Sequence, residues 1–247
     1  MRLFYMALKP CQVGMSVLMV ILTINVQAQE PYTLTSDDVE VVDGIIQCVH
    51  YNFENKHVVI PDWLDEQKVV GIADKDFNDT DGFIGKGIES VLLPPTLGVI
   101  GSNAFAFNLL ENVDIPAGVT SIGSYAFASS QLASVSIPKG VTAISEGAFS
   151  DNKLVRVIIP ESVTTIGDYA FESNQLVNVM IPMNVTLLSD YAFKSNQLVS
   201  VSIREEVPTM IAGKDAFESK DLSHVNIVDS VSIISAHVLK EKHAYPN

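Results

Sequence analysis

Residues 110–131 read LENVDIPAGVTSIGSYAFASSQ, and the next unit, residues 132–153, reads LASVSIPKGVTAISEGAFSDNK. Two further units follow without a gap, and a fifth carries two extra residues. The leading leucine recurs every 22 residues, at Leu110, Leu132, Leu154, Leu176 and Leu198. An earlier unit starts at Ile88 and a degraded one at Leu222. A fixed period of this length indicates a repeat array in which each unit packs against its neighbours.

The apolar positions of one unit outline a single coil of a solenoid. Val113 and Ile115 point to one side of a short strand, and Pro116 ends the hydrogen-bond ladder of that strand. Val119 and Ile122 form a second apolar pair, which comes before an Ala-Phe step and a polar turn. The phenylalanine of that step is expected to form one buried stack along the solenoid axis: Phe105, Phe127, Phe149, Phe171, Phe193 and Phe217.

A polar residue follows three positions after most of these phenylalanines. It is Asn108, Asn152, Asn174 or Asn196, with Ser130 as a variant. An asparagine at this place suits a ladder whose amides satisfy backbone groups of adjacent coils. It equally suits a turn that needs a positive φ, and the sequence leaves both interpretations open.

These units resemble the BspA-like leucine-rich repeats, which read roughly L-x-x-V-x-I-P-x-x-V-x-x-I-x-x-x-A-F before a short polar turn. The match extends from Ile88 to about Leu239 and departs from many family members by having Asn or Ser where a buried Cys is common. The resemblance implies a mainly β, leucine-rich-repeat solenoid of about seven 22-residue coils plus an imperfect first coil. It also implies a secreted or surface-attached bacterial protein, often one involved in adhesion.

The segment before the regular repeats is predicted to close the open end of the solenoid. Residues 29–87 are assigned to an N-terminal β cap and the imperfect first coil, 88–239 to the solenoid, and 240–247 to a polar tail. Asp43-Gly44 offers a hairpin turn, so residues of about 39–60 are expected to form a β-hairpin or small meander. Phe77 is assigned to the buried phenylalanine position of the first coil.

Residues 1–28 combine a short basic region, an apolar run from about Val13 to Val26, and a small-residue exit that ends at Ala28. This pattern predicts a secretory signal peptide that is cleaved after Ala28. An uncleaved membrane anchor would need roughly 20 apolar residues, and the run is shorter. The expected location is therefore outside the cell or at its surface.

The composition argues against a nucleic acid partner. The chain has 247 residues, 47% of them hydrophobic, and 15 basic against 29 acidic side chains give a formal net charge of −14. Such a field repels phosphate backbones, so we expect no nucleic acid partner. The apolar content is enough for a packed core, and no run after residue 28 is long enough to span a membrane.

No pattern in the sequence predicts catalysis, a cofactor or a metal site. The histidines lack i,i+4 pairing, and the H-E-x-x-H, P-loop, G-x-S-x-G and dinucleotide fingerprints are all missing. Cys48 lies in a strand-like run without an adjacent base, which favours a packed thiol. Residues 74–82 resemble a calcium loop, but Asp79 stands where a turn glycine is needed and Gly85 where a bidentate glutamate is needed. A solvated insertion loop is expected there.

The outward positions of the first strand in each unit form the candidate binding face. Most of these positions hold small polar residues, but Ile158 and Met180 are consecutive in one column and lie beside Arg156 and Asn178. These four residues are the candidate partner-binding site.

The leading hypothesis is a monomeric, non-enzymatic module that presents a repeat surface to an extracellular protein or glycan. The alternative is a structural spacer with no specific ligand.

Overall fold

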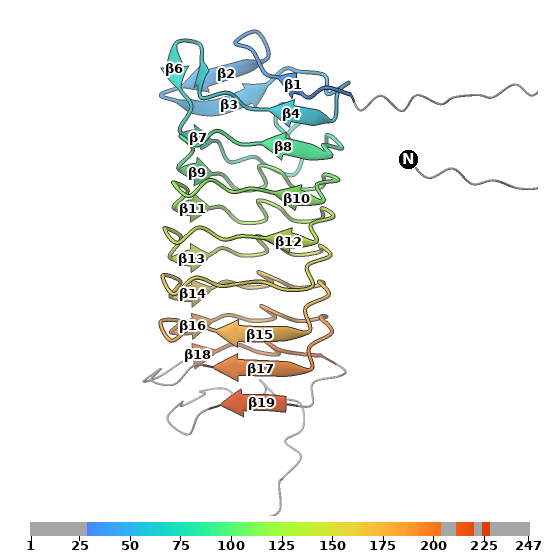
Figure 1. Cartoon of the computed structure of the whole chain (residues 1–247), viewed down its shortest axis with the longest axis vertical. Coiled ribbons are helices and arrows are strands. Elements are labelled where there is room, and N and C mark those ends of the chain that lie inside the picture. The colour runs from blue at the N-terminus through green and yellow to red at the C-terminus, as the bar shows by residue number, and fades with distance from the viewer. Residues whose placement is uncertain (1–28, 204–210, 220–223, 228–247) are drawn as a thin grey trace, which may run out of the picture.

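The computed structural model describes residues 29–203, 211–219 and 224–227, the last of these as backbone only. The predicted signal peptide at 1–28 and the polar tail at 240–247 lie outside the described residues. Within the described ranges the chain forms short strands joined by turns, with no helix. Figure 1 shows the coils stacked one below the other along the long axis. The expectation of a mainly β solenoid is confirmed.

Most coils contribute one strand to each of two columns of strands, which lie on opposite sides of the stack (Figure 1). Within each column neighbouring strands pair in parallel, except that β2 pairs antiparallel with β3. The first strand column contains β1 (Tyr32–Thr33), β4 (His57–Val59), β8 (Ser90–Leu92), β10 (Asn112–Val113), β12 (Ser134–Val135), β15 (Asn178–Ile181), β17 (Ser200–Ile203) and β19 (His224–Ile227). The second strand column contains β2 (Val39–Val42), β3 (Ile45–Val49), β7 (Gly71–Ile72), β9 (Val99–Ile100), β11 (Ser121–Ile122), β13 (Ala143–Ile144), β14 (Thr165–Ile166), β16 (Leu187–Leu188) and β18 (Ile211–Ala212). A separate small hairpin pairs β5 (Trp63–Leu64) with β6 (Gln67–Lys68).

The strand register follows the sequence period. Asn178 of β15 pairs with Ser200 of β17, so partners lie one repeat apart in parallel orientation. Leu187 of β16, in the fourth unit, pairs with Ile211 of β18 in the fifth, and this longer offset absorbs the two extra residues of the fifth unit. Each coil therefore places the same unit position directly over its equivalent in the next coil.

The phenylalanine column is confirmed as the centre of the core. From Phe105 to Phe217 the successive ring centroids lie 5.1 to 5.8 Å apart and the planes differ by at most 14°. Each ring is at most 1% exposed. Because one coil covers only one face of each ring, neighbouring coils must be in place for the ring to be buried.

The assignment of Phe77 to this column is wrong. Its ring is 55% exposed, and Phe83 occupies the buried place instead, 5.1 Å from Phe105 between ring centroids. The insertion between β7 and β8 lengthens the path of the chain, so the Phe of the first coil comes later than its strands suggest. Phe83 keeps the repeat spacing to Phe105, and this was the signal that would have identified it.

The asparagine positions form a hydrogen-bond ladder between coils. Asn152 Oδ1 accepts from the Leu132 backbone N–H at 3.0 Å, and its Nδ2 donates to the backbone oxygens of Phe127 at 2.9 Å and Phe149 at 3.2 Å. Asn108, Asn174 and Asn196 repeat the arrangement. The positive φ belongs to the preceding residue, for example 53° at Asp151. Of the two interpretations, the amide ladder is therefore correct.

The N-terminal hairpin is present as predicted. β2 and β3 pair antiparallel through a two-residue turn in which Asp43 has a φ of 52° and Gly44 a φ of 76°. Two successive positive φ values match the turn type that fits the twist of a hairpin. β3 also pairs in parallel with β7, so the hairpin covers the exposed edge of the second strand column.

We expect the Phe171→Ala variant to lose about 3–5 kcal/mol of unfolding free energy, because the truncation opens a cavity between Phe149 and Phe193. Urea denaturation followed by circular dichroism measures the loss. Phe107→Ala is the matched control, since the Phe107 ring is 51% exposed. A loss at Phe171 below about 0.5 kcal/mol, typical of a surface substitution, would contradict the buried stack.

Ser130 interrupts the asparagine ladder, and its buried Oγ has no hydrogen-bond partner among the described residues. The Ser130→Asn variant is expected to gain about 1 kcal/mol in the same urea experiment, because the amide restores the contacts made at Asn152. The reverse change, Asn152→Ser, is expected to cost about 1–3 kcal/mol. A stabilising Asn152→Ser would show that the ladder does not hold adjacent coils together.

Candidate functional site

The outer face of the first strand column carries the predicted binding residues. Val157 and Ile159 are buried, whereas Ile158 between them is 70% exposed. Met180 is 55% exposed, and Arg156 and Asn178 are also exposed. The inward and outward positions thus follow the period of two that the sequence indicated.

The structure brings these four residues together. Arg156, Ile158, Asn178 and Met180 line one shallow depression of about 360 Å³, together with Ser200 and Ser202. Parallel pairing of β15 with β17 sets Met180 beside Ser202, and a bridge joins Ile158 to Ser136 of the preceding coil. The backbone under the depression is therefore held by the stacked coils on both sides.

Hydrogen bonding orders one polar side chain of this depression. Ser200 Oγ donates to Asn178 Oδ1 at 2.5 Å, so the amide orientation is set by the next coil. The depression offers the Ile158 and Met180 side chains, one guanidinium, an amide and the Glu161 carboxylate. This combination can contact an apolar group and hydrogen-bond a polar or charged group of a partner.

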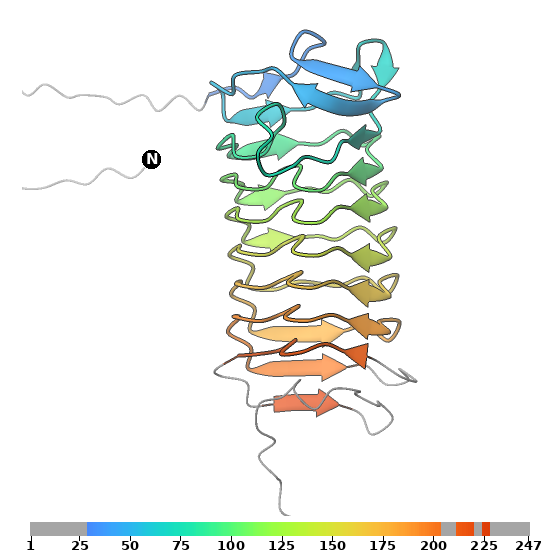
Figure 2. The ribbon, with the colours of Figure 1, turned by 180° about the vertical axis from the view of Figure 1, so that it is seen from behind.

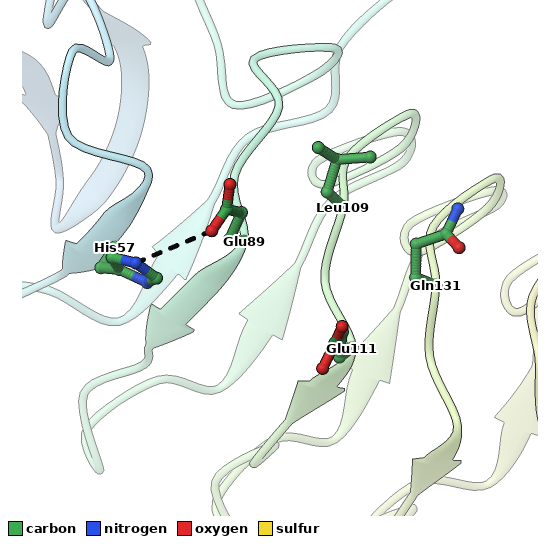
Figure 3. Close-up of a pocket in the computed structure, with 5 residues that line it drawn as sticks. All are labelled: His57, Glu89, Leu109, Glu111 and Gln131. Atoms are coloured by element: carbon green, nitrogen blue, oxygen red, sulfur yellow. Dashed lines mark ion pairs between the residues drawn. The ribbon is translucent and has the colours of Figure 1, made fainter. Parts of the chain in front are cut away.

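A second depression, of about 540 Å³, lies where the chain enters the first strand column (Figure 3). It is lined by His57, Glu89, Leu109, Glu111 and Gln131. His57 Nε2 lies 3.7 Å from Glu89 Oε2, and His57 Nδ1 is hydrogen-bonded to Ser90 Oγ at 2.9 Å. Figure 3 shows the Glu89 carboxylate turned toward the imidazole.

Sequence reasoning missed this second depression. Its residues come from the first coil and the next two units, and all except His57 stand just outside the strands, where a polar side chain looks like ordinary solvated surface. Glu89 and Glu111 do occupy the same unit position one repeat apart, and that was the available signal. Only the contact between His57 and Glu89 shows that the first coil forms one side of this depression.

The acidic loop at 74–82 uses one carboxylate to attach to the next coil and another to close its own turn. Asp74 Oδ1 accepts from the Ser102 backbone N–H, and Asp79 Oδ2 accepts from the Asp76 backbone N–H at 2.8 Å. Within the ranges that the structure describes, no group of three or more His, Cys, Asp or Glu side chains could hold a metal ion. The same ranges contain no helix that is long and apolar enough to cross a membrane.

Cys48 belongs to a hydrogen-bonded group that joins β3 to this loop. Its Sγ donates to Asp81 Oδ2 at 3.0 Å, and Lys75 Nζ lies 2.9 Å from Asp81 Oδ1. Hydrogen bonds from Cys48 and Lys75 lower the pKa of Asp81 to about 2. The hydrogen bond to this carboxylate raises the pKa of the Cys48 thiol, with partial burial adding to the effect. The sulfur is thereby kept protonated, which is the opposite of an activated nucleophile.

A comparison with protein families gives one match. The family described as BspA type leucine rich repeat region matches residues 76–199 and 120–244, in 6 copies. These ranges begin within the insertion between β7 and β8 and include every residue of the phenylalanine column. No curated protein matches the sequence at a significant level.

Solved structures of bacterial leucine-rich repeat proteins are also similar. A leucine-rich repeat protein from T. pallidum is 22% identical, with 79% of this chain and 82% of that chain covered and a TM-score of 0.46. One from Bacteroides ovatus is 25% identical, with coverage of 72% and 57% and a TM-score of 0.46. A leucine-rich cell surface protein from Faecalibacterium prausnitzii is 22% identical, with coverage of 81% and 69% and a TM-score of 0.42.

We expect the Asp81→Asn variant to react faster with iodoacetamide at Cys48. Loss of the carboxylate removes the main cause of the raised thiol pKa, so the thiolate fraction near pH 8 should rise. Peptide mass spectrometry of time points measures alkylation at this site. Asp76→Asn in the same loop is the control and should react like wild type. An unchanged rate in Asp81→Asn would contradict the assigned cause.

Proposed function

This chain belongs to the BspA type leucine rich repeat family, and we propose that it is a secreted or cell-surface interaction module without catalytic activity. Its partner is an extracellular protein or glycan that binds the outer face of the first strand column. The pattern of residues 1–28 and the family membership support export. The repeat fold supports a binding role through its extended, regular surface.

The observation that carries this proposal is the clustering of Arg156, Ile158, Asn178 and Met180 in one depression. Exposed aliphatic side chains interrupt a column that otherwise presents mainly serine and asparagine near this point. Covering one such side chain contributes about 1.5–3 kcal/mol, and a neighbouring arginine supplies directional contacts. Both features are typical of the residues that dominate binding energy at interfaces.

The rigidity of the array supports the same function. Asn178 and Met180 project from β15, which pairs in parallel with β17, and Ile158 forms an isolated parallel bridge to Ser136, with Val157 and Ile159 anchored in the core below. A partner would therefore meet a backbone that is already ordered before binding. Preorganisation of this kind increases affinity without increasing the contact area.

The test is a double variant, Ile158→Ser with Met180→Ser, screened against an array of extracellular-matrix proteins and glycans. We expect its thermal stability to stay close to wild type and its binding to the array ligand to weaken by about tenfold or more. Leu92→Ser is the matched control, because Leu92 is 59% exposed in the same column but lies outside the depression.

Three results would contradict the proposal. Unfolding of the double variant would show that these side chains support the core. Binding equal to wild type would move the interface to the caps or to the side that carries Thr120, Thr142, Thr164 and Thr186. A wild-type protein that binds nothing on the array would favour the spacer function instead.

A further inference from the structure

A cluster of aromatic side chains lies on the turn side of the coils, away from the first strand column. The Phe77 ring contacts Phe107 edge-on at 5.9 Å and Tyr125 at 5.7 Å between centroids. Phe77 is 55% exposed and Phe107 is 51% exposed. Figure 2 shows the insertion between β7 and β8, in dark teal, folded across the upper coils on this side.

The loop that carries Phe77 is fixed to the coil below it. The Lys75 backbone N–H donates to the Ser102 oxygen at 2.9 Å, and Asn103 Nδ2 donates to the Lys75 oxygen at 2.6 Å. The Lys75 side chain is turned inward, 10% exposed and paired with Asp81. The loop therefore holds the Phe77 ring at a defined place on the surface.

Phenylalanine is not required by the repeat at position 107. It has a φ of 57°, and the equivalent places in other coils hold Ser129, Asp151, Ser173 and Ser195, with similar positive φ values. A bulky residue in the left-handed region costs free energy, and a half-exposed ring returns little of it through burial. The packing of the solenoid gives no reason for phenylalanine here.

Carboxylates adjoin two of the three rings, at Tyr125 through a hydrogen bond and at Phe77 through the preceding residue of the chain. Tyr125 donates its hydroxyl proton to Glu146 Oε1 at 2.7 Å, and Glu146 is exposed. Burial raises the pKa of the Tyr125 phenol, and Glu146 and Asp168 raise it further, so the hydroxyl stays protonated. Asp76, next to Phe77, is exposed as well. The patch therefore combines aromatic faces with negative charge, on a chain whose net charge is −14.

We propose that this aromatic patch, formed by Phe77, Phe107, Tyr125, Asp76 and Glu146, binds a basic peptide segment of another protein. An arginine or lysine side chain of the partner lies over an exposed ring and pairs with a flanking carboxylate. Cations are attracted to aromatic faces, and a carboxylate beside the ring adds a charge-assisted hydrogen bond. An apolar partner would bury these carboxylates without a counter-charge, and an acidic partner would be repelled.

This site is independent of the proposed interface on the first strand column. The probe is a fluorescein-labelled peptide of alternating arginine and glycine, and its Kd is measured by fluorescence anisotropy at near-physiological salt. The neutral counterpart has citrulline in place of arginine. We expect wild type to bind the arginine peptide with a Kd below about 1 mM and the citrulline peptide about tenfold more weakly.

Phe107→Ser is the principal variant, because serine occupies the equivalent position in three other coils. It should weaken binding of the arginine peptide by about fivefold to tenfold, and Glu146→Gln should weaken it by a similar factor. The double variant Ile158→Ser with Met180→Ser is the control and should bind the peptide like wild type.

The outcomes separate the two sites. Equal binding of the citrulline peptide, or wild-type affinity in a folded Phe107→Ser variant, would overturn the proposal, as would undetectable binding by wild type. Weakening in the first-column double variant but not in Phe107→Ser would place the peptide on the other face. Loss of array binding in that double variant bears on the proposed function alone.

Discussion

Parallel stacking of equivalent positions, one repeat apart, is the constraint on which the rest of the structure depends. No single coil can bury a phenylalanine ring, because each ring needs a neighbour on both faces. The rings of Phe149 and Phe171, 5.6 Å apart and nearly parallel, satisfy this need only when the strands on both sides pair in register. Core packing and strand pairing therefore both depend on the same repeat period, and neither can form in register without the other.

The asparagine ladder supplies the polar half of this arrangement. Asn174 accepts from the Leu154 N–H and donates to the Phe149 and Phe171 oxygens, so one side chain satisfies backbone groups in adjacent coils. Buried backbone groups without partners would cost about as much as the apolar contacts contribute. The ladder thus lets irregular turns pack against the apolar core. The side chains that point outward from the strands are not needed for these hydrogen bonds.

Exposed residues that differ from their equivalents in the other units are consequently the candidates for binding a partner. Ile158 and Met180 replace small polar residues on the first strand column, and Phe107 replaces serine or aspartate on the turn side. None of the three contributes substantially to the core, as their exposed fractions show. The two surfaces differ in chemistry, since one combines aliphatic groups with both a guanidinium and a carboxylate, whereas the other combines aromatic rings with carboxylates alone.

The sequence alone determined the main features that rest on local spacing. Its period predicted the solenoid and the phenylalanine column, alternation predicted that Ile158 points outward between Val157 and Ile159, and Asp43-Gly44 predicted the hairpin turn. The period also suggested that the four candidate residues would be neighbours. These inferences succeed because each depends on a backbone geometry that repeats along the chain.

Tertiary structure decided whatever depends on the path of a segment that breaks the period. The insertion before β8 places Phe83 in the core and leaves Phe77 outside against Phe107 and Tyr125. It also brings Asp81 to Cys48, and the first coil brings His57 to Glu89. The contacts of Phe77, Cys48 and His57 join residues whose separations in sequence share no common spacing. They follow from the three-dimensional course of the chain, which periodicity does not specify.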